Sequence, residues 1–139
     1  MITFQNEAVK QSMTVIGERG YPYEICGFLF GKDGNPRVVT EVFECGNLNK
    51  LKPETRYDMD PKDYMKGEAL ARQKGLDVLG IFHSHPDHPD KASETDRQAA
   101  WPGFSYVIMS IQKGKYASMR SWVLDDTSQF QEEPILPNL

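Results

Sequence analysis

The sequence predicts an α/β fold in which helices pack against a single mixed β-sheet. Short apolar segments of strand length alternate along the chain with segments whose apolar residues recur at helical spacing. Turn and capping residues separate these segments, so the expected order is helix, strand, strand, helix, strand, helix, strand, strand. Such an alternation is typical of one layered domain. The 139 residues are enough for a single domain with a substantial core.

The first half of the chain is expected to form two helices around a pair of strands. Val9, Met13 and Ile16 would share one face of the first helix. Turn residues separate the two strands, which are therefore expected to pair as a hairpin. Asp60 is the expected N-cap of the second helix, with Pro61 at its first position. The predicted elements are a helix over 7–19, strands over 25–30 and 38–43, a loop over 45–57, and a helix over 61–74.

The second half of the chain is expected to form a buried strand, a short helix and a final pair of strands. The predicted elements are a strand over 76–85, a helix that starts at Ser93 and ends before 101–103, and strands over 105–111 and 117–123. The polar segment 125–139 contains two prolines, so we expect it to fray or to pack only loosely. The predicted organisation is one domain over 1–124 and a C-terminal tail over 125–139.

The segment His83-Ser84-His85-Pro86 carries the most specific chemical pattern in the chain. It continues an apolar strand, and the period of two places His83 and His85 on the same face, with Ser84 on the other. Pro86 cannot donate a hydrogen bond to a neighbouring strand and therefore marks the strand end. The two imidazoles would thus converge at the end of a rigid element.

A third candidate ligand, Asp96, lies eleven residues beyond His85. Ser93 is a plausible N-cap of a short helix, and residues three apart on a helix face the same way, so Ser93 and Asp96 would point together. Two imidazoles and a carboxylate suit a catalytic zinc ion, because three protein ligands leave a fourth position for water. Alternatives from the residues alone are a hydrogen-bonded strand-end His85 and a simple helix cap formed by Ser93 and Asp96.

Taken together, these residues resemble the JAMM signature of the MPN-domain metalloproteases. That signature also has a glutamate just before an apolar strand near the N-terminus, and Glu24 precedes the apolar segment that begins Ile25-Cys26-Gly27. Residues 47–61 are also similar to the middle region of the family. The resemblance extends from about residue 7 to residue 124. It implies the MPN architecture, which is similar to that of the cytidine deaminases, and the compact chain resembles a prokaryotic member.

The resemblance implies a role for each of the five signature residues. His83, His85 and Asp96 would bind Zn²⁺, with water as the fourth ligand. Glu24 would take a proton from that water and later pass it to the leaving amine. The hydroxyl of Ser93 would help the zinc ion to stabilise negative charge on the carbonyl oxygen. His88, the third histidine of the chain, is interpreted as a solvated loop residue.

Composition and charge argue against several other classes of protein. The net charge of −4 gives no basic surface for nucleic acid. No apolar run approaches the roughly 20 residues of a membrane span, and the first residues do not resemble a signal peptide. The two cysteines, Cys26 and Cys45, do not suggest a disulfide framework. We therefore expect a cytoplasmic protein without nucleic-acid or membrane partners.

The expected function is that of a zinc metallopeptidase that hydrolyses an amide bond at the C-terminal tail of a ubiquitin-like protein. The resemblance to the prokaryotic branch implies a small sulfur carrier of this kind, or a peptide, as the substrate. One alternative is a zinc hydrolase of small peptides or amides. Others are a non-catalytic MPN scaffold and a structural metal site that His88 would close as a fourth protein ligand.

Overall fold

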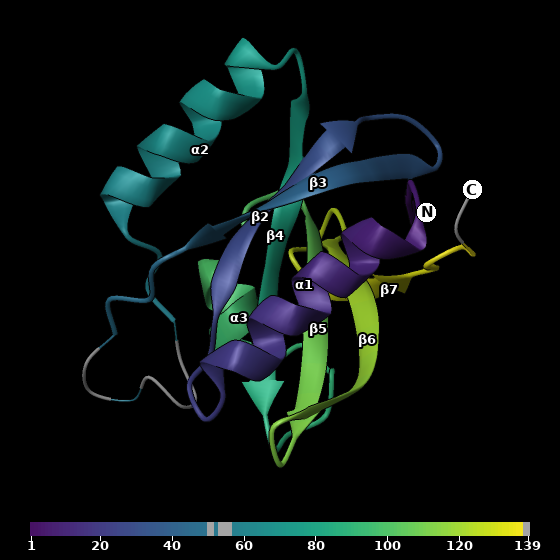
Figure 1. Cartoon of the computed structure of the whole chain (residues 1–139). Coiled ribbons are helices and arrows are strands. Elements are labelled where there is room, and N and C mark those ends of the chain that lie inside the picture. Colours follow the sequence, from purple (N-terminus) through teal and green to yellow (C-terminus); the bar gives the residue numbers. More distant parts are fainter. Residues whose placement is uncertain (50–51, 53–56, 138–139) are drawn as a thin grey trace.

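A seven-stranded mixed sheet forms the centre of the structure (Figure 1), a computed structural model that describes residues 1–49, 52 and 57–137. The strands are β1 (Ile2–Phe4), β2 (Cys26–Lys32), β3 (Arg37–Cys45), β4 (Asp77–Pro86), β5 (Ser105–Gln112), β6 (Lys115–Leu124) and β7 (Phe130–Glu133). The helices are α1 (Glu7–Gly20), α2 (Pro61–Gln73) and α3 (Glu94–Ala99). The strand order is β1-β3-β2-β4-β5-β6-β7, in which β1–β3 and β4–β5 are parallel and the other pairs antiparallel. The predicted fold class is therefore confirmed.

The two long helices bury opposite faces of the sheet. Figure 1 shows α1 crossing in front of the strands. Leu29 of β2 packs in the same apolar cluster as Met13 of α1, whereas Phe28 and Phe30 pack in a second cluster with Ala71 of α2. Because successive side chains of β2 point to opposite faces of the sheet, this one strand contributes to both apolar clusters. A strand at the centre of such a sheet is rigid, because it is covered on both sides.

Local signals start the helices where the sequence predicts. The side chain of Asn6 accepts a hydrogen bond from Val9 N and caps α1. Asp60 caps α2 by accepting from Lys62 N at 2.9 Å, and Pro61 occupies the first turn. Gly75 follows α2 with φ of +67°, a left-handed conformation that glycine adopts without steric cost.

Gly27 of β2 lets the side chain of Phe82, in the neighbouring strand β4, approach the backbone of β2 closely. A Cβ atom on Gly27 would lie 2.6 Å from the ring of Phe82 and 2.3 Å from the carbonyl oxygen of Phe43. Only the absence of a side chain lets Phe82 pack flat over β2 at this point. The predicted hairpin of β2 and β3 also forms, with Cys26 opposite Cys45 in its register.

The prediction that the C-terminal tail frays is wrong. Residues Phe130–Glu133 form β7 on the edge of β6, and Ile135 then bridges to Ile2 of β1. Ile2 N donates to Pro134 O at 3.1 Å, and Leu136 N donates to Ile2 O at 2.8 Å. The two ends of the sheet therefore meet and curl it. Neither β1 nor β7 was predicted, because each is too short or too polar to show a strand period.

The domain division at residue 124 stays a prediction, although the tail segment packs against the sheet. The predicted loop over 45–57 falls partly outside the described residues, at 50, 51 and 53–56. Asn47, in its described part, forms a bridge to Met59, which lies two residues beyond the predicted loop. Cys26 and Cys45 are buried free thiols, and burial raises the pKa of Cys45 to about 12. At that pKa the thiol is a packing group and not a nucleophile at neutral pH.

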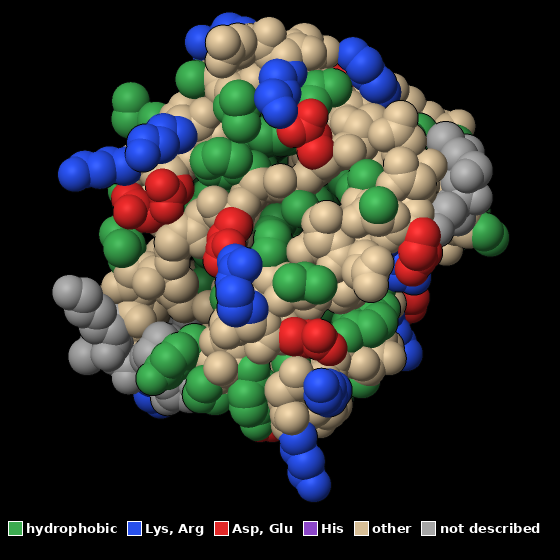
Figure 2. Space-filling view, viewed as in Figure 1, with side chains coloured by type: hydrophobic (Ala, Val, Ile, Leu, Met, Phe, Trp, Pro, Cys, Tyr) green, Lys and Arg blue, Asp and Glu red, His purple; other side chains and the backbone are tan. Residues whose placement is uncertain are grey.

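The surface shows no feature that would suggest a nucleic-acid partner on the face of Figure 2. Lysine and arginine side chains are interspersed there with aspartate and glutamate. In the part of the chain that the structure describes, no helix has the length and apolar character needed to cross a membrane.

The packing of β7 generates a stability prediction. Ser121 is fully buried and donates a hydrogen bond of 2.6 Å to Glu133, whose other carboxylate oxygen lies 3.3 Å from the N-terminal amine. Glu133→Ala should lower the free energy of unfolding by about 1–3 kcal/mol, because it leaves the Ser121 hydroxyl buried without its acceptor. Urea denaturation measures this change.

The neighbouring Glu132 provides a matched control. Its side chain is 51% exposed and lies 3.8 Å from Arg120, so Glu132→Ala removes only a surface ion pair. Such pairs contribute roughly 0–1 kcal/mol. Equal losses for the two variants would contradict a specific role for the buried Ser121–Glu133 contact.

Candidate metal centre and active site

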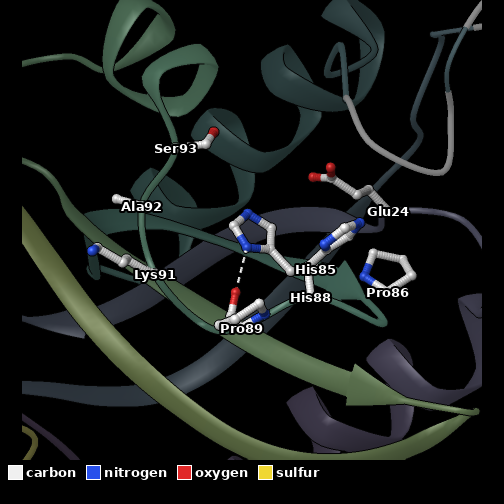
Figure 3. A pocket seen from close by; sticks show the side chains of 8 residues that line it. All are labelled: Glu24, His85, Pro86, His88, Pro89, Lys91, Ala92 and Ser93. Atoms are coloured by element: carbon white, nitrogen blue, oxygen red, sulfur yellow. Dashed lines mark hydrogen bonds between the residues drawn. The ribbon is translucent and has the colours of Figure 1, made fainter.

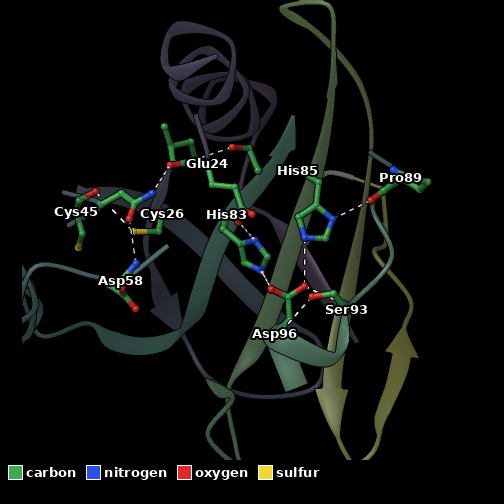
Figure 4. A network of polar contacts seen from close by, with 12 residues as sticks. Glu24, Cys26, Cys45, Asp58, His83, His85, Pro89, Ser93 and Asp96 are labelled. Carbon is green, nitrogen blue, oxygen red and sulfur yellow. Dashed lines mark hydrogen bonds and ion pairs between the residues drawn. The ribbon is translucent and has the colours of Figure 1, made fainter. Parts of the chain in front are cut away.

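Side chains from three separate elements converge at the C-terminal end of β4 (Figure 4). Glu24 lies just before β2, His83 and His85 lie in the last part of β4, and Asp96 lies in the first turn of α3. Glu24, His83 and His85 are all buried, and one ligand atom from each lies within 4.8 Å of the others. The structure thus brings together residues that are up to 72 positions apart in the sequence, between Glu24 and Asp96.

The pairing of β2 with β4 places Glu24 beside the histidines. Cys26 lies opposite His83 in the antiparallel register. One residue further along, Ile25 N donates to the Ser84 hydroxyl at 3.0 Å, and Ser84 N donates to Ile25 O at 3.2 Å. Ser84 therefore points away from the histidines, as its position in the strand predicts. Its hydroxyl extends the pairing of the two strands up to the residue that follows Glu24.

His83 lies between two carboxylates and is completely buried. Its Nδ1 is 3.5 Å from Oε1 of Glu24, and its Nε2 is 3.6 Å from Oδ1 of Asp96. Neither nitrogen has a hydrogen-bond partner among the described residues, and the same holds for Oε1 of Glu24. Buried polar atoms are nearly always paired, so three unpaired atoms in one place indicate a site built for a further group. Imidazole nitrogen and carboxylate oxygen are the donors that zinc accepts.

His85 has a defined ring orientation. Its Nδ1 lies 2.8 Å from the carbonyl oxygen of Pro89, which can only accept, so Nδ1 carries the hydrogen. Nε2 then faces Oδ2 of Asp96 at 3.1 Å. Burial opposes the charged form, but the contacts with Asp96 and Pro89 O raise the pKa of His85 above its ordinary value. Histidines that bind metals commonly donate their second N–H to such a carbonyl.

Asp96 serves both the helix and the cluster. Ser93 Oγ accepts from Asp96 N at 3.1 Å, and Oδ2 of Asp96 accepts from Ser93 N at 2.9 Å, which together form a capping box. Although burial acts in the opposite direction, His83, His85 and Ser93 N hold the pKa of Asp96 far below its ordinary value. The capping interpretation and the metal-ligand interpretation of these residues are therefore compatible.

A surface pocket of about 430 Å³ opens onto this cluster (Figure 3). Its lining residues are Glu24, His85, Pro86, His88, Pro89, Lys91, Ala92 and Ser93. Figure 3 shows Glu24 and Ser93 on the two sides of the His85 ring. A ligand in the pocket would therefore meet the carboxylate, the hydroxyl and the imidazole together, while His83 lies beneath them.

The loop that lines the pocket is anchored at its start. Asp87 accepts from the Tyr21 hydroxyl at 2.5 Å and from Lys113 N at 2.7 Å, and it takes a left-handed φ of +58°. These bonds fix the turn that carries the Pro89 carbonyl to His85. His88 is exposed in this loop, and its ring is not among the ligand atoms that converge, so the solvated-loop interpretation agrees with its position.

Sequence reasoning missed two contributors to the site. One is the carbonyl oxygen of Pro89, which is a backbone atom, so the residue type gives no sign that it would contact His85. The ring of Tyr57 makes a tilted contact with the ring of His83, with 4.7 Å between the ring centroids. Tyr57 lies within the segment 47–61, which is similar to the family, but nothing in the local pattern shows that its ring reaches β4.

Several named proteins are similar to this chain. A desampylase of Pyrococcus furiosus is 32% identical over 115 residues, which cover 81% of this chain and 75% of the relative. A CysO-cysteine peptidase of Mycobacterium bovis is 26% identical over 125 residues, covering 89% and 83%. A probable TtuB-protein conjugate cleaving protease of Thermus thermophilus is 34% identical over 91 residues, covering 65% and 57%.

Solved structures show the same fold. The solution structure of a Desulfitobacterium hafniense protein superposes with a TM-score of 0.85 at 30% identity, over 99% of this chain and 93% of that one. The crystal structure of a JAB1/MPN domain protein from Archaeoglobus fulgidus gives 0.61 at 15% identity over the full length of both chains, which bears on the fold alone. Residues 6–125 match the family described as prokaryotic homologs of the JAB domain. The chain therefore belongs to the prokaryotic JAB-domain family, as its JAMM-like motif predicted.

Proposed function

We propose that this protein is a zinc-dependent peptidase that hydrolyses an amide bond at the C-terminal tail of a ubiquitin-like sulfur-carrier protein. The observation that carries the proposal is the buried cluster of Glu24, His83, His85 and Asp96, whose unpaired atoms lie beneath an open pocket. The names of three relatives support the substrate class, since they are a desampylase, a CysO-cysteine peptidase and a TtuB-protein conjugate cleaving protease.

His83, His85 and Asp96 are the residues that would hold the zinc ion. Nε2 of both histidines faces the Asp96 carboxylate, at 3.6 Å and 3.1 Å, and this donor set leaves room for a non-protein ligand in a tetrahedral site. When bound, zinc supplies a Lewis acid that makes water acidic near neutral pH and polarises a carbonyl group. The JAB/MPN relationship also favours zinc over other divalent metals.

Glu24 is placed to move the proton. Its side chain is 4% exposed, its Oε1 has no hydrogen-bond partner among the described residues, and it also lines the pocket. A carboxylate in this position would accept a proton from the attacking water and donate it to the leaving amine. The amide of Asn47 donates to the backbone oxygen of Glu24 at 3.0 Å and holds the residue at the pocket edge.

Ser93 is placed to stabilise the carbonyl oxygen of the substrate. The cap bond uses its oxygen as an acceptor, and none of the described residues accepts a hydrogen bond from its hydroxyl. The hydroxyl hydrogen is therefore available for an oxygen in the pocket, which Ser93 lines opposite Glu24. A preorganised donor of this kind acts mainly in the transition state.

The alternatives differ in what they need from the site. A scaffold module has no use for buried unpaired donors and acceptors, whose burial costs about 1–3 kcal/mol each. A structural zinc site closed by His88 would need that side chain in the cluster, but His88 is exposed. A hydrolase of small peptides would use the same groups, and it is separated by comparing a folded carrier with a free peptide of the same tail sequence.

Substitution of Glu24 tests its role in proton transfer. Glu24→Gln should retain one zinc ion per chain and lose at least about a hundredfold in turnover, because the amide cannot carry the proton. The measurement is mass spectrometry of a panel of ubiquitin-like carriers with C-terminal extensions or conjugated amines, with and without a chelator. Metal content is measured on the same samples.

Glu44→Gln is the matched control, because Glu44 is an exposed acid of β3 that pairs with Arg19 away from the pocket. It should cleave like the wild type. The proposal is lost if no member of the panel shows chelator-sensitive cleavage, or if Glu24→Gln cleaves as fast as the control. Equal rates on free peptides and folded carriers would favour the small-peptide alternative.

The second prediction separates the two roles of Ser93. Ser93→Gly removes the hydroxyl but keeps an acceptable N-cap residue, so the stability of the protein should fall by only a few tenths of a kcal/mol. The turnover number should nevertheless fall on the order of a hundredfold. Ser93→Thr, which retains both groups, should stay within a few-fold of the wild type. A fully active Ser93→Gly enzyme would reduce Ser93 to a helix cap.

The third prediction concerns the pH dependence of the metal-free protein. The raised pKa of His85 stabilises the fold below its ordinary value of 6.5, and this contribution is lost as the pH rises through the raised pKa. The lowered pKa of Asp96 stabilises the fold above its ordinary value of 3.8, and this contribution is lost as the pH falls. Both contributions are present between these two values.

The measurement compares the unfolding of the wild type and Asp96→Asn in chelator across a pH series. The stability advantage of the wild type should be largest between the two ordinary values and should shrink at alkaline pH, once His85 is neutral. An advantage that stays constant from acidic to alkaline pH would show that the two side chains are not coupled.

A further inference from the structure

The two histidines of the site differ in how their rings are oriented. His85 donates from Nδ1 to the Pro89 carbonyl at 2.8 Å, a bond that sets both the tautomer and the ring plane. His83 has no such bond: both of its nitrogens are buried without a hydrogen-bond partner among the described residues. Its nearest polar atoms are carboxylate oxygens at 3.5 Å and 3.6 Å, beyond a well-formed hydrogen bond. Something other than a hydrogen bond must therefore hold the plane of this ring.

The ring of Tyr57 contacts the ring of His83 in a tilted arrangement. The ring centroids lie 4.7 Å apart with an interplanar angle of 33°, whereas His83 and His85 lie 5.1 Å apart at 54°. Burial, followed by the negative charge of Asp96, raises the pKa of Tyr57 well above its ordinary value, so its hydroxyl is neutral at all physiological pH values. A flat, uncharged ring at this distance restricts rotation of the imidazole about its side-chain bonds.

The position of Tyr57 depends in turn on Asn47. The side-chain oxygen of Asn47 accepts from Asp58 N at 2.9 Å, next to Tyr57. Leu48 N donates to Asp58 O at 2.8 Å, and Asn47 bridges to Met59. The amide nitrogen of the same Asn47 donates to Glu24 O at 3.0 Å. The side chain of Asn47 therefore joins the segment that carries Tyr57 to the segment that carries Glu24. Figure 4 shows Glu24 and Asp58 on the side of His83, opposite His85 and Pro89.

We propose that Tyr57 is a positioning residue that holds the ring of His83 in the orientation required for zinc binding, and that Asn47 secures Tyr57 in that place. The adjacent ring of Tyr57 restricts the orientation of His83, as the hydrogen bond to the Pro89 carbonyl restricts that of His85. The inference rests on the proposed zinc site, and it adds a determinant of metal affinity that lies outside the five signature residues.

The test measures zinc affinity by competition with a chromogenic chelator and records the visible spectrum of the cobalt(II)-substituted protein. Tyr57→Leu removes the ring face and should raise the zinc dissociation constant about tenfold or more, in the range found when supporting partners of metal ligands are lost. It should also change the cobalt spectrum, because one imidazole is less well oriented. Tyr57→Phe keeps the ring and should match the wild type in both measurements.

Tyr64→Leu is the matched control. Tyr64 and Tyr57 both pack against the apolar cluster that contains Phe28. The ring of Tyr64 makes an edge contact with Phe28 at 5.1 Å, and no ring contact joins it to either histidine among the described residues. It should bind zinc and cobalt like the wild type. Equal weakening by Tyr57→Leu and Tyr64→Leu would reduce the effect to general loss of packing and would overturn the proposal.

Asn47→Ala provides a second variant in which the Tyr57 ring is retained. It should weaken zinc binding by a smaller factor than Tyr57→Leu, and an unchanged affinity would overturn the role of Asn47 even if Tyr57→Leu did not fold. A wild-type protein that binds no zinc would refute the proposed function itself. A wild type that binds zinc, with Tyr57→Leu unchanged in affinity and spectrum, would refute only the role of Tyr57.

Discussion

The functional architecture depends on the burial of two histidines and two carboxylates at one end of β4. Each polar atom that is withdrawn from water without a partner costs about 1–3 kcal/mol, and three such atoms meet at His83 and Glu24. The apolar clusters that cover both faces of the sheet oppose this cost. A metal ion bound by Nε2 of His83 would satisfy one of these three atoms, so metal binding and folding stability would be coupled in a site of this kind.

The groups that form the site are held by three different kinds of interaction. Strand pairing, extended by the hydroxyl of Ser84, aligns Glu24 with the histidines. Helix capping places Asp96, whose carboxylate both closes the first turn of α3 and faces the imidazoles. A backbone carbonyl, carried by a loop that Asp87 anchors, orients His85. Because each support comes from a different element, no single turn or helix forms the site alone.

This arrangement also separates the candidate metal ligands by their depth below the surface. His83 lies beneath the surface and is fully buried, whereas His85, Glu24 and Ser93 line the opening. In the proposed function, a substrate in the pocket would contact Glu24 and Ser93, while His83 stays away from solvent. Exclusion of water around His83 strengthens its electrostatic interactions with the carboxylates on either side.

Much of this protein could be predicted from the sequence alone, because the informative signals are local. Apolar periodicity located the long strands and helices, Asp60 and Pro61 marked the start of α2, and the spacing of His83, His85, Ser93 and Asp96 indicated a metal site. These features follow from side-chain direction in a strand and from capping in the first turn of a helix, which neighbouring residues determine.

The tertiary structure decided the rest, because the remaining contacts join distant segments that carry no local pattern. The strands β1 and β7 are short; β1 pairs with β3, which is distant in the sequence, and β7 pairs with β6, while residues 134–136 join the two edges at Ile2. The Pro89 carbonyl and the Tyr57 ring reach the histidines across loops, where neither residue type nor spacing reveals a partner. The sequence by itself determined which residue types the candidate site holds, and folding determined the orientation of its groups, since orientation depends on which surfaces pack together.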